Sequence, residues 1–303
     1  MRLRAAVMGD AVVDVHVSGT SPRVGSDVPA AIRLEPGGQG ANLAVRLARR
    51  GVDVRLGCSL ADDAAGRMLR ERLTADGVEM MVAPAERTGA VVVLVDADGE
   101  RSMLSQRVPL TPALDAIFLG HLVADLDWLA VSGYVLLEPD AEVLARSLVT
   151  TPARRVVLGC ALRPVEAARW HASAAACRPS LLVLNADEAA TVAGTTDPAD
   201  APARLAKDLA PAVVVTQTGG ATAVIDGTQV AAWGQVAEEA VDTTGAGDAF
   251  AAALLATIGR DHLTARILEA ALTAAVQAGS AATRVIGAQG RIPGERDADR
   301  LHS

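Results

Sequence analysis

The chain has 303 residues, of which 50% are hydrophobic and 21% are charged, so it can bury one large core, or one core and a small appendage. Its formal net charge is −8 and it has no basic cluster, which disfavours nucleic acid and anionic membranes as partners. It has no apolar stretch of the length that a signal peptide or a membrane span requires, so we expect a cytoplasmic protein.

Short β-branched runs alternate with helix-like stretches along the chain. The first strand, "RAAVMG", is followed after an interruption by the helix "QGANLAVRLARRG", then by the strand "VRLGCSL" and the helix "DAAGRMLRERLTADG". Nearly continuous apolar strands then occur at "DWLAVSG", "RVVLGCA", "LLVLN" and "AVVVTQ", with helices such as "PDAEVLARSLV" between them. This pattern predicts an α/β fold with a doubly wound, mostly parallel sheet flanked by helices.

Two segments interrupt the alternation. Residues 11–34 are rich in valine and contain no helix pattern, and "AVVVLVDADGERSMLSQ" is typical of two strands joined by a turn at Asp98 and Gly99. The segments 11–34 and 89–107, with approximate bounds, are therefore expected to form a small antiparallel flap, or lid. Arg101 and Arg107 on this lid could meet a carboxylate, a phosphate or only solvent, and exposure to solvent is the plainer interpretation. No repeat or linker divides the chain, which favours a single domain, residues 1–303, with the lid inserted in it.

The distribution of reactive residue types excludes several chemistries. Cys58, Cys160 and Cys177 are widely spaced in apolar surroundings, which indicates reduced structural thiols. Lys207 is the only lysine, so the lysine of a Walker A loop or of a protein kinase is absent. The histidines lack zinc-binding spacing and Ser132 is not in a GxSxG motif, so zinc hydrolases and α/β-hydrolases are not indicated.

Polar residues near the first strand and the first helix could bind a ligand. Asp14, in "MGDAVVDVHV", would lie at the carboxyl end of the first strand, where such sheets bind ligands, or in a surface turn. In "EPGGQGANLAVRLARRG", Gly38 and Gly40 let the backbone approach a ligand closely, and Asn42 can donate and accept hydrogen bonds to a polyhydroxylated molecule. A dinucleotide loop is disfavoured, because it would directly follow the first strand.

The segment "LLVLNADEAATVAG" has two interpretations that the sequence leaves equally open. Asn185 and Glu188 follow a buried strand and could present oxygen ligands to a hydrated Mg²⁺ ion and its phosphates. The same spacing is that of a capping box, with asparagine as the N-cap and glutamate three residues later.

The segment "VDTTGAGDAF" combines a glycine-rich loop with a carboxylate at the start of a helix. Gly245 and Gly247 allow successive N–H groups to point at an anion, and the positive end of the helix dipole adds to this. A carboxylate would repel a phosphate that is only bound, whereas phosphoryl transfer needs a group that orients and deprotonates a hydroxyl. Asp248 is therefore a candidate base; alternatively it is only an N-cap.

Four motifs in this order, "GDAVVD", "GGQGANLA", "NADE" and "DTTGAGDAF", together resemble the ribokinase (PfkB) family of carbohydrate and nucleoside kinases. The resemblance implies the ribokinase-like fold, with a β-lid that closes over the sugar and often pairs with a second subunit, so we expect a homodimer. It also implies ATP and Mg²⁺, and it allows potassium as a further ion.

The resemblance assigns roles to individual residues. Asp248 corresponds to the base, and Gly245, Ala246 and Gly247 to the anion hole for the transferred phosphoryl group. The remaining roles are substrate binding by Asp14, Gly38, Gly40, Asn42 and Glu138, nucleotide binding by Asn185, Glu188, Thr216, Thr218 and Gly219, magnesium binding through water by Asn185 and Glu188, and a monovalent-cation site at Asp242 and Thr244. This chain departs from the family at Gln39, where a lysine is common, at Thr218 and Ala221, where glycines are usual, and at Arg291, where a small residue is frequent.

The leading hypothesis is an ATP- and Mg²⁺-dependent kinase that phosphorylates a primary hydroxyl of a small sugar. A nucleoside kinase, adenosine- or pseudouridine-like, is the alternative, and a catalytically silent sugar or nucleotide sensor of the same fold is another. The low aromatic content, 2%, favours a sugar over a nucleoside, because a base is commonly bound by stacking.

Overall fold

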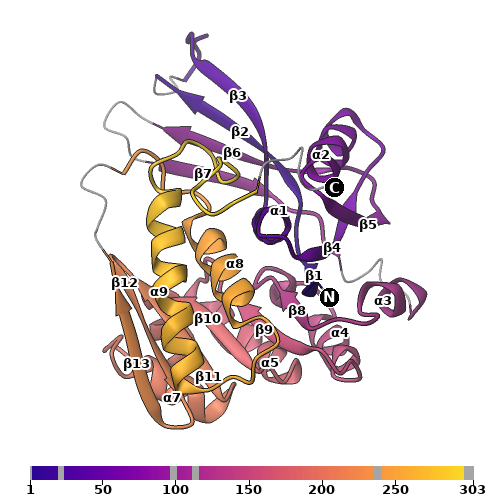
Figure 1. The fold of residues 1–303 in the computed structure, drawn as a ribbon. Helices are drawn as coiled ribbons and strands as arrows, with labels where there is room; N and C mark the ends of the chain where they lie inside the picture. The colour runs from indigo at the N-terminus through magenta and orange to yellow at the C-terminus, as the bar shows by residue number, and fades with distance from the viewer. Residues whose placement is uncertain (1, 20–23, 96–100, 111–115, 235–239, 297–303) are drawn as a thin grey trace.

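The computed structural model describes residues 2–19, 24–95, 101–110, 116–234 and 240–296. Nine strands form one large sheet in the order β13-β12-β11-β10-β9-β8-β1-β4-β5 (Figure 1). Seven of them run parallel: β1 (Arg4–Met8), β4 (Asp53–Leu60), β5 (Val78–Pro84), β8 (Trp128–Val131), β9 (Arg154–Leu158), β10 (Leu181–Asn185) and β11 (Ala212–Gln217). The predicted mostly parallel, doubly wound sheet is confirmed.

An antiparallel hairpin extends this sheet at one edge. It consists of β12 (Gly220–Ile225) and β13 (Thr228–Trp233), and Ile225 pairs with Thr228 across a two-residue turn. Asp226 and Gly227, which form this turn, both have positive φ, 48° and 76°. An Asp-Gly turn between apolar runs is a strong hairpin signal, so the sequence did contain the information for these strands.

Helices cover both faces of the large sheet because its strands are apolar on both faces. Alternate residues of β1, such as Ala5 and Val7 on one side and Ala6 and Met8 on the other, belong to two separate buried clusters. The first cluster includes residues of α1 (Gln39–Arg49), α2 (Ala64–Ala75), α8 (Ala246–Ile258) and α9 (Ala265–Ala282). The second includes residues of α3 (Ala116–Leu122), α4 (Ala141–Leu148), α5 (Ala167–Ala176), α6 (Ala186–Ala193) and α7 (Ala201–Asp208).

A second, four-stranded sheet, here called the small sheet, projects beyond the large one (Figure 1). Its strand order is β3-β2-β6-β7, formed by β3 (Ala31–Gly37), β2 (Val12–Ser18), β6 (Gly89–Val95) and β7 (Arg101–Gln106). The outer pairs are antiparallel, as expected, but β2 and β6 pair in parallel. A parallel pair needs a long connection, which is available because these two strands come from separate parts of the chain. The expected turn at Asp98 and Gly99 lies outside the described residues.

The position of Asp14 differs from the prediction. The first strand ends at Met8, and Asp14 lies within β2 of the small sheet, where its side chain is buried. The expectation that it ends the first strand, or stands in a surface turn, is therefore wrong. β1 of the large sheet and β2 of the small sheet are separated by three residues, and both are rich in apolar residues, so the sequence pattern does not show where one strand ends and the next begins.

The three cysteines are free and buried, and burial raises the pKa of each thiol to about 12. This agrees with inert structural thiols. Within the described ranges, no helix has the length and apolar character needed to cross a membrane.

Candidate active site

The glycine-rich loop leads directly into α8, as its sequence predicts. Gly245 is the N-cap of the helix in the left-handed region, with φ of 75°, and a Cβ at this position would lie 2.7 Å from the carbonyl oxygen of Ala288. At Gly247, by contrast, a Cβ would meet no atom within 4 Å. The loop is therefore packed on one side and open on the other, where an anion can reach its backbone N–H groups.

Asp248 is the third residue of α8 and not its N-cap, so the interpretation of Asp248 as a cap is wrong. Asn42 of α1 donates its Nδ2–H to Oδ2 of Asp248 over 3.1 Å. Burial raises the pKa of Asp248 to about 7; the bond from Asn42 and the positive charges of Arg46 and Arg107 oppose this shift, and the charge of Asp14 adds to it. A carboxylate with a pKa near neutrality is suited to accept a proton at physiological pH.

Asp14 and the glycines around the start of α1 lie close to this carboxylate. A Cβ at Gly37 would overlap the carboxylate of Asp14, and one at Gly40 would lie 2.7 Å from the backbone of Gly9. Gly38, the N-cap of α1, has φ of 96°. The pKa of Asp14 is raised to about 7, mainly by burial and to a smaller extent by the negative charges of Glu35 and Asp242. The structure thus brings Asp14, Gly38, Gly40, Asn42 and Asp248 together from three segments of the chain.

The side chain of Gln39 is bound within the protein. Its Oε1 accepts hydrogen bonds from Ser132 Oγ at 2.6 Å and from the backbone N–H of Gly133 at 3.1 Å, and its Nε2 donates to the carbonyl oxygen of Gly159 at 2.7 Å. The side chain therefore ties the start of α1 to the segments that follow β8 and β9.

Arg107 meets a carboxylate, one of the partners that the sequence left open, and the plainer interpretation of an exposed lid arginine is wrong. Its guanidinium forms an ion pair with Asp10 and lies over the ring of Tyr134, 3.6 Å from the ring centroid. Burial lowers the pKa of Arg107, although nearby charges, including that of Asp248, oppose this. The side chain of Arg101 lies outside the described residues. Neighbours from distant segments decide this placement, and no local pattern indicates it.

Glu138 has a contact that positions the chain. Its Oε2 accepts a hydrogen bond from the backbone N–H of Leu110 over 2.8 Å. Leu110 is buried and follows the small sheet, so this bond helps to fix the return from the small sheet to the large one.

A cavity of about 310 Å³ lies between the turn that joins β11 to β12 and the helices α8 and α9. Its lining includes the predicted nucleotide residues Thr216, Thr218 and Gly219, together with Ala246 and Gly247. Its volume is at the lower end of the range for ligand pockets. Ala221, which replaces a usual glycine, is fully buried in the core opposite Thr216, so its methyl group does not narrow the cavity.

A smaller cavity of about 110 Å³ adjoins the first, since Thr216 and Gly247 line both. Its lining also includes Asp248, Asn185 and Glu188. The predicted nucleotide, metal and base residues therefore meet around two neighbouring cavities.

Asn185 and Glu188 form the capping box at the start of α6. Asn185 Oδ1 accepts from the N–H of Glu188 over 2.8 Å, and Glu188 Oε2 accepts from the N–H of Asn185 over 2.9 Å. Burial is the main cause that raises the pKa of Glu188. A capping role does not exhaust these oxygens, because each carboxylate or amide oxygen has a second lone pair.

The donor set fits a water-mediated magnesium ion better than a direct one. Among the described residues, no group of three or more His, Cys, Asp or Glu side chains could enclose a metal. Mg²⁺ usually retains water and is held by one or two carboxylates together with phosphates, which Asn185 and Glu188 beside the smaller cavity can match.

Asp242 stabilises the loop before α8. Its Oδ1 accepts from the N–H of Thr244 over 2.8 Å, and its Oδ2 accepts from the N–H of Gly287 over 2.9 Å. Gly287 belongs to a C-terminal segment whose contacts with the site the sequence analysis did not identify.

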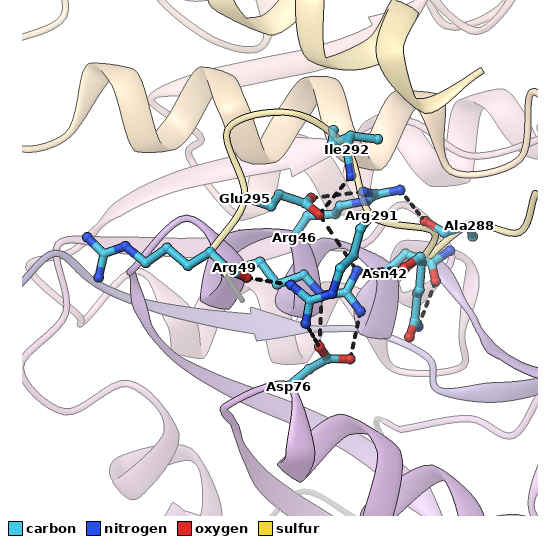
Figure 2. A network of polar contacts seen from close by, with 10 residues as sticks. Asn42, Arg46, Arg49, Asp76, Ala288, Arg291, Ile292 and Glu295 are labelled. Carbon is cyan, nitrogen blue, oxygen red and sulfur yellow. Dashed lines mark hydrogen bonds and ion pairs between the residues drawn. The ribbon is translucent and has the colours of Figure 1, made fainter. Parts of the chain in front are cut away.

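That C-terminal segment, residues 284–296, packs against α1 (Figure 2). Arg46 donates to the carbonyl oxygen of Ala288 over 2.8 Å, and Gln289 donates its Nε2–H to Oδ1 of Asn42 over 3.0 Å. A signal for this packing was present, because Asn42, Arg46 and Arg49 recur on one face of a helix that also has a strongly apolar face.

The comparisons with known proteins agree with this arrangement. The family model described as pfkB family carbohydrate kinase matches residues 3–294. A fructokinase from Klebsiella pneumoniae is 30% identical over 328 residues, with 97% of each chain covered, and an aminoimidazole riboside kinase from Salmonella typhimurium is 30% identical over 291 residues, with 85% of each covered.

Solved structures of low sequence identity share the fold. An adenosine kinase from Sinorhizobium meliloti has a TM-score of 0.79 at 21% identity, covering 97% of this chain and 98% of its own. A ribokinase from Arabidopsis thaliana complexed with ribose and ATP has a TM-score of 0.78 at 23% identity, and the match covers 100% of this chain and 98% of the ribokinase. A putative ribokinase II from E. coli in complex with ATP and Mg²⁺ has a TM-score of 0.79 at 18% identity, covering 99% and 98%.

The fold, the glycine-rich start of α8 and these matches define an ATP-dependent kinase that acts on sugars or nucleosides. The chain belongs to the PfkB family of carbohydrate kinases.

Proposed function

We propose that this protein transfers the γ-phosphoryl group of ATP to a primary hydroxyl of a small sugar, with Asp248 as the base. The observation that carries the proposal is the position of Asp248 on the wall of the smaller cavity, which adjoins the larger one, with a hydrogen bond from Asn42 and a pKa of about 7. The fructokinases among its relatives support a sugar as the acceptor.

The reaction follows from this arrangement. The carboxylate of Asp248 accepts the proton of the hydroxyl, the hydroxyl oxygen attacks the γ-phosphorus, and the bond to the bridging oxygen breaks, so that ADP leaves. The N–H groups of Gly245, Ala246 and Gly247 stabilise the negative charge on the transferred group. Magnesium, held through water by Asn185 and Glu188, would neutralise charge on the phosphates.

The sugar side of the site consists of Asp14, Gly38, Gly40 and Asn42 in this proposal. The carboxyl of Asp14 and the amide of Asn42, together with the carboxyl of Asp248, provide donors and acceptors for several hydroxyl groups. Glu138 is assigned to the same side, where its bond to Leu110 would link substrate binding to the position of the small sheet, which acts as a lid.

The environment of the aromatic residues supports a sugar rather than a nucleoside. Trp128 and Trp170 are completely buried in the two cores, and Phe250 is 4% exposed. One face of the Tyr134 ring is covered by Arg107. A base would therefore find little aromatic surface to stack on among these residues. The relatives named adenosine kinase and aminoimidazole riboside kinase make a nucleoside the second candidate.

The proposal includes Asp242 and Thr244 as the place where potassium acts. The two oxygens of Asp242 accept the backbone N–H groups of Thr244 and Gly287, and a carboxylate of this kind is a suitable oxygen ligand for a cation. The activity in KCl should then exceed that in tetramethylammonium chloride at equal ionic strength; equal activity in the two salts would remove this assignment.

The decisive experiment is ADP release with ATP and Mg²⁺ over a panel of ketoses, aldoses and nucleosides, with the wild type, Asp248→Asn and the exposed-site control Asp208→Asn. Turnover should depend on a sugar acceptor and should fall by about 10²- to 10⁴-fold in Asp248→Asn alone. Full activity of Asp248→Asn would remove Asp248 from its role. Faster turnover of a nucleoside than of any sugar would favour the second candidate, and no turnover in the wild type would favour a silent sensor.

A further inference from the structure

The hydrogen bond between Asn42 and Asp248 depends on the orientation of an amide. A side-chain amide has one donating and one accepting end, and only Nδ2 of Asn42 can donate to an ionised carboxylate. If the amide rotated by half a turn, Oδ1 would face Asp248 and oppose its ionisation. Some other contact must therefore select the orientation with Nδ2 towards Asp248.

Gln289 makes that contact. Its Nε2 donates to Oδ1 of Asn42 over 3.0 Å, so the accepting end of Asn42 is directed away from Asp248. Two hydrogen bonds therefore form a series: Gln289 donates to Asn42, and Asn42 donates to Asp248. The first pair is 247 positions apart in the chain and the second pair is 206 positions apart. Hydrogen bonds in such a series strengthen one another.

The backbone around Gln289 is held on both sides. Gly287 donates its N–H to Asp242 over 2.9 Å, and Ala288 lies against Gly245 at the start of α8. On the other side, Arg46 and Arg49 of α1 donate to the carbonyl oxygens of Ala288 and Gln289, over 2.8 and 2.5 Å. The short segment 287–289 thus contacts the loop before α8, α8 itself and α1.

Buried ion pairs hold these two arginines in place. The side chains of Arg46 and Glu295 are 0% and 1% exposed and are joined by a contact of 2.8 Å, and Arg49 makes two bonds to Asp76, of 2.8 and 2.9 Å. Figure 2 shows both arginines directed at the C-terminal segment that carries Ala288, Ile292 and Glu295. Breaking a buried pair of this kind is costly, which favours one geometry for the segment.

We propose that Gln289 is a positioning residue that orients the amide of Asn42 so that Asp248 is held as a carboxylate. The inference rests on the proposed function, since it concerns the residue assigned there as the base. Gln289 acts through Asn42 and is not assigned any contact with the substrate.

The groups that face Asp248 determine how this role can be measured. They are Asn42 and Arg46 of α1, Asp14 of β2, and Arg107, which follows β7. The arginines favour the ionised form, and Asp14 opposes it. Loss of the bond from Asn42 should therefore raise the pKa of Asp248, and the acidic limb of the pH profile of kcat should move to higher pH. One pKa unit changes the carboxylate fraction below the pKa by about tenfold.

The test compares Gln289→Met, which removes the amide at nearly constant length, with Gln289→Glu, which can only accept from Asn42. Both should lower kcat at pH values below about 7 and shift the acidic limb upwards, and Gln289→Glu should have the larger effect. The control is Gln229→Glu, which adds the same charge at an exposed position of β13 and should leave the profile unchanged.

A double-mutant cycle shows whether Gln289 acts through Asn42. In an Asn42→Ala background, Gln289→Met should cause no further shift of the pH profile. A wild-type profile of soluble, folded Gln289→Met would overturn the inference, and so would equal shifts in both backgrounds. If Gln289→Met does not fold, the comparison of Gln289→Glu in the two backgrounds decides the question in the same way.

The outcomes separate the two proposals. If Asp248→Asn retains full activity, the proposed function fails, whatever Gln289 does. If Asp248→Asn is inactive and the Gln289 variants behave as wild type, the proposed function stands and only the role of Gln289 fails.

Discussion

Asp14 and Asp248 are acidic side chains whose pKa the protein raises to about 7, in both cases mainly by burial. An aspartate carboxyl in an unfolded chain has a pKa of about 3.8, so in the folded protein both carboxyls stay protonated up to a much higher pH than usual. Because Asp14 contributes to the shift of Asp248, the two should titrate as a coupled pair in a pH profile.

The raised pKa of Asp248 predicts how stability depends on pH. A group whose pKa is higher in the folded state contributes stability at low pH and loses that contribution as the pH rises through the folded value, here about 7. Asp248→Asn should therefore stabilise the protein by about 1 to 3 kcal/mol near pH 8 and by clearly less near pH 5. Urea unfolding at several pH values measures this; a gain that does not change with pH would contradict it.

Gly40 is required by the close approach of two backbone segments. A Cβ there would lie 2.7 Å from backbone atoms of Gly9, which cannot move aside as a flexible side chain could. Gly40→Ala should lower the free energy of unfolding by about 1 to 3 kcal/mol. The matched control is Gly120→Ala in α3, where an added Cβ would meet no neighbouring atom within 4 Å. This substitution should leave the free energy of unfolding unchanged or raise it. Equal effects of the two substitutions in urea unfolding would refute the steric argument.

At the scale of the elements, α6 and α8 begin in different ways at the same site. Asn185 and Glu188 cap α6 with their side chains, whereas α8 starts at Gly245 without a side-chain cap. No side chain therefore occupies the N–H groups at the start of α8, although that of Ala246 donates to the carbonyl oxygen of Thr243 over 3.3 Å, whereas the capping box of α6 binds the N–H groups of Asn185 and Glu188.

Glu188→Gln separates the two interpretations of this glutamate. Glutamine can accept the same hydrogen bond from Asn185, so the capping box is retained and unfolding should change by less than about 1 kcal/mol. If the charge of Glu188 also serves magnesium, kcat should fall by about tenfold or more, and more Mg²⁺ should be needed for half-maximal activity. Unchanged kinetics would leave Glu188 with the capping role alone.

At the scale of the whole molecule, one face of the small sheet carries a row of apolar side chains. The strand register places Leu34, Val15, Val92 and Leu104 in one row across the four strands. Leu34 and Leu104 are 61% and 65% exposed. Val15 and Val92 are half-buried, and Val15 packs against the first buried cluster. Exposed leucines on the two edge strands of the small sheet are typical of an interaction surface, which supports the expected homodimer.

Light scattering tests the proposed homodimer. The wild type should have about twice the 31.0 kDa mass of one chain, and Leu34→Asp should reduce it to that of a monomer. The control is Val165→Asp, which places the same charge at a position that is 81% exposed elsewhere on the surface and should leave the dimer intact. A monomeric wild type would exclude pairing through this face.

The sequence by itself determined the large sheet, most of its helices and the candidate loops. These depend on local properties: apolar runs that fit strands buried on both faces, glycines where φ is positive, and the spacing of Asn185 and Glu188. The Asp-Gly turn between β12 and β13 is an equally local signal, although these two strands were not among those predicted. Family resemblance added the roles of residues that no local pattern could assign.

Only the tertiary structure decided the environment of these residues. It placed Asp14 in the small sheet, Arg107 over Tyr134, and Gln289 against Asn42. Each of these depends on segments that are far apart in the sequence, and the pKa of Asp248 depends on burial and charges from several of them. Local patterns do not contain such information, because burial and electrostatic interaction are set by distance in space and not by position along the chain.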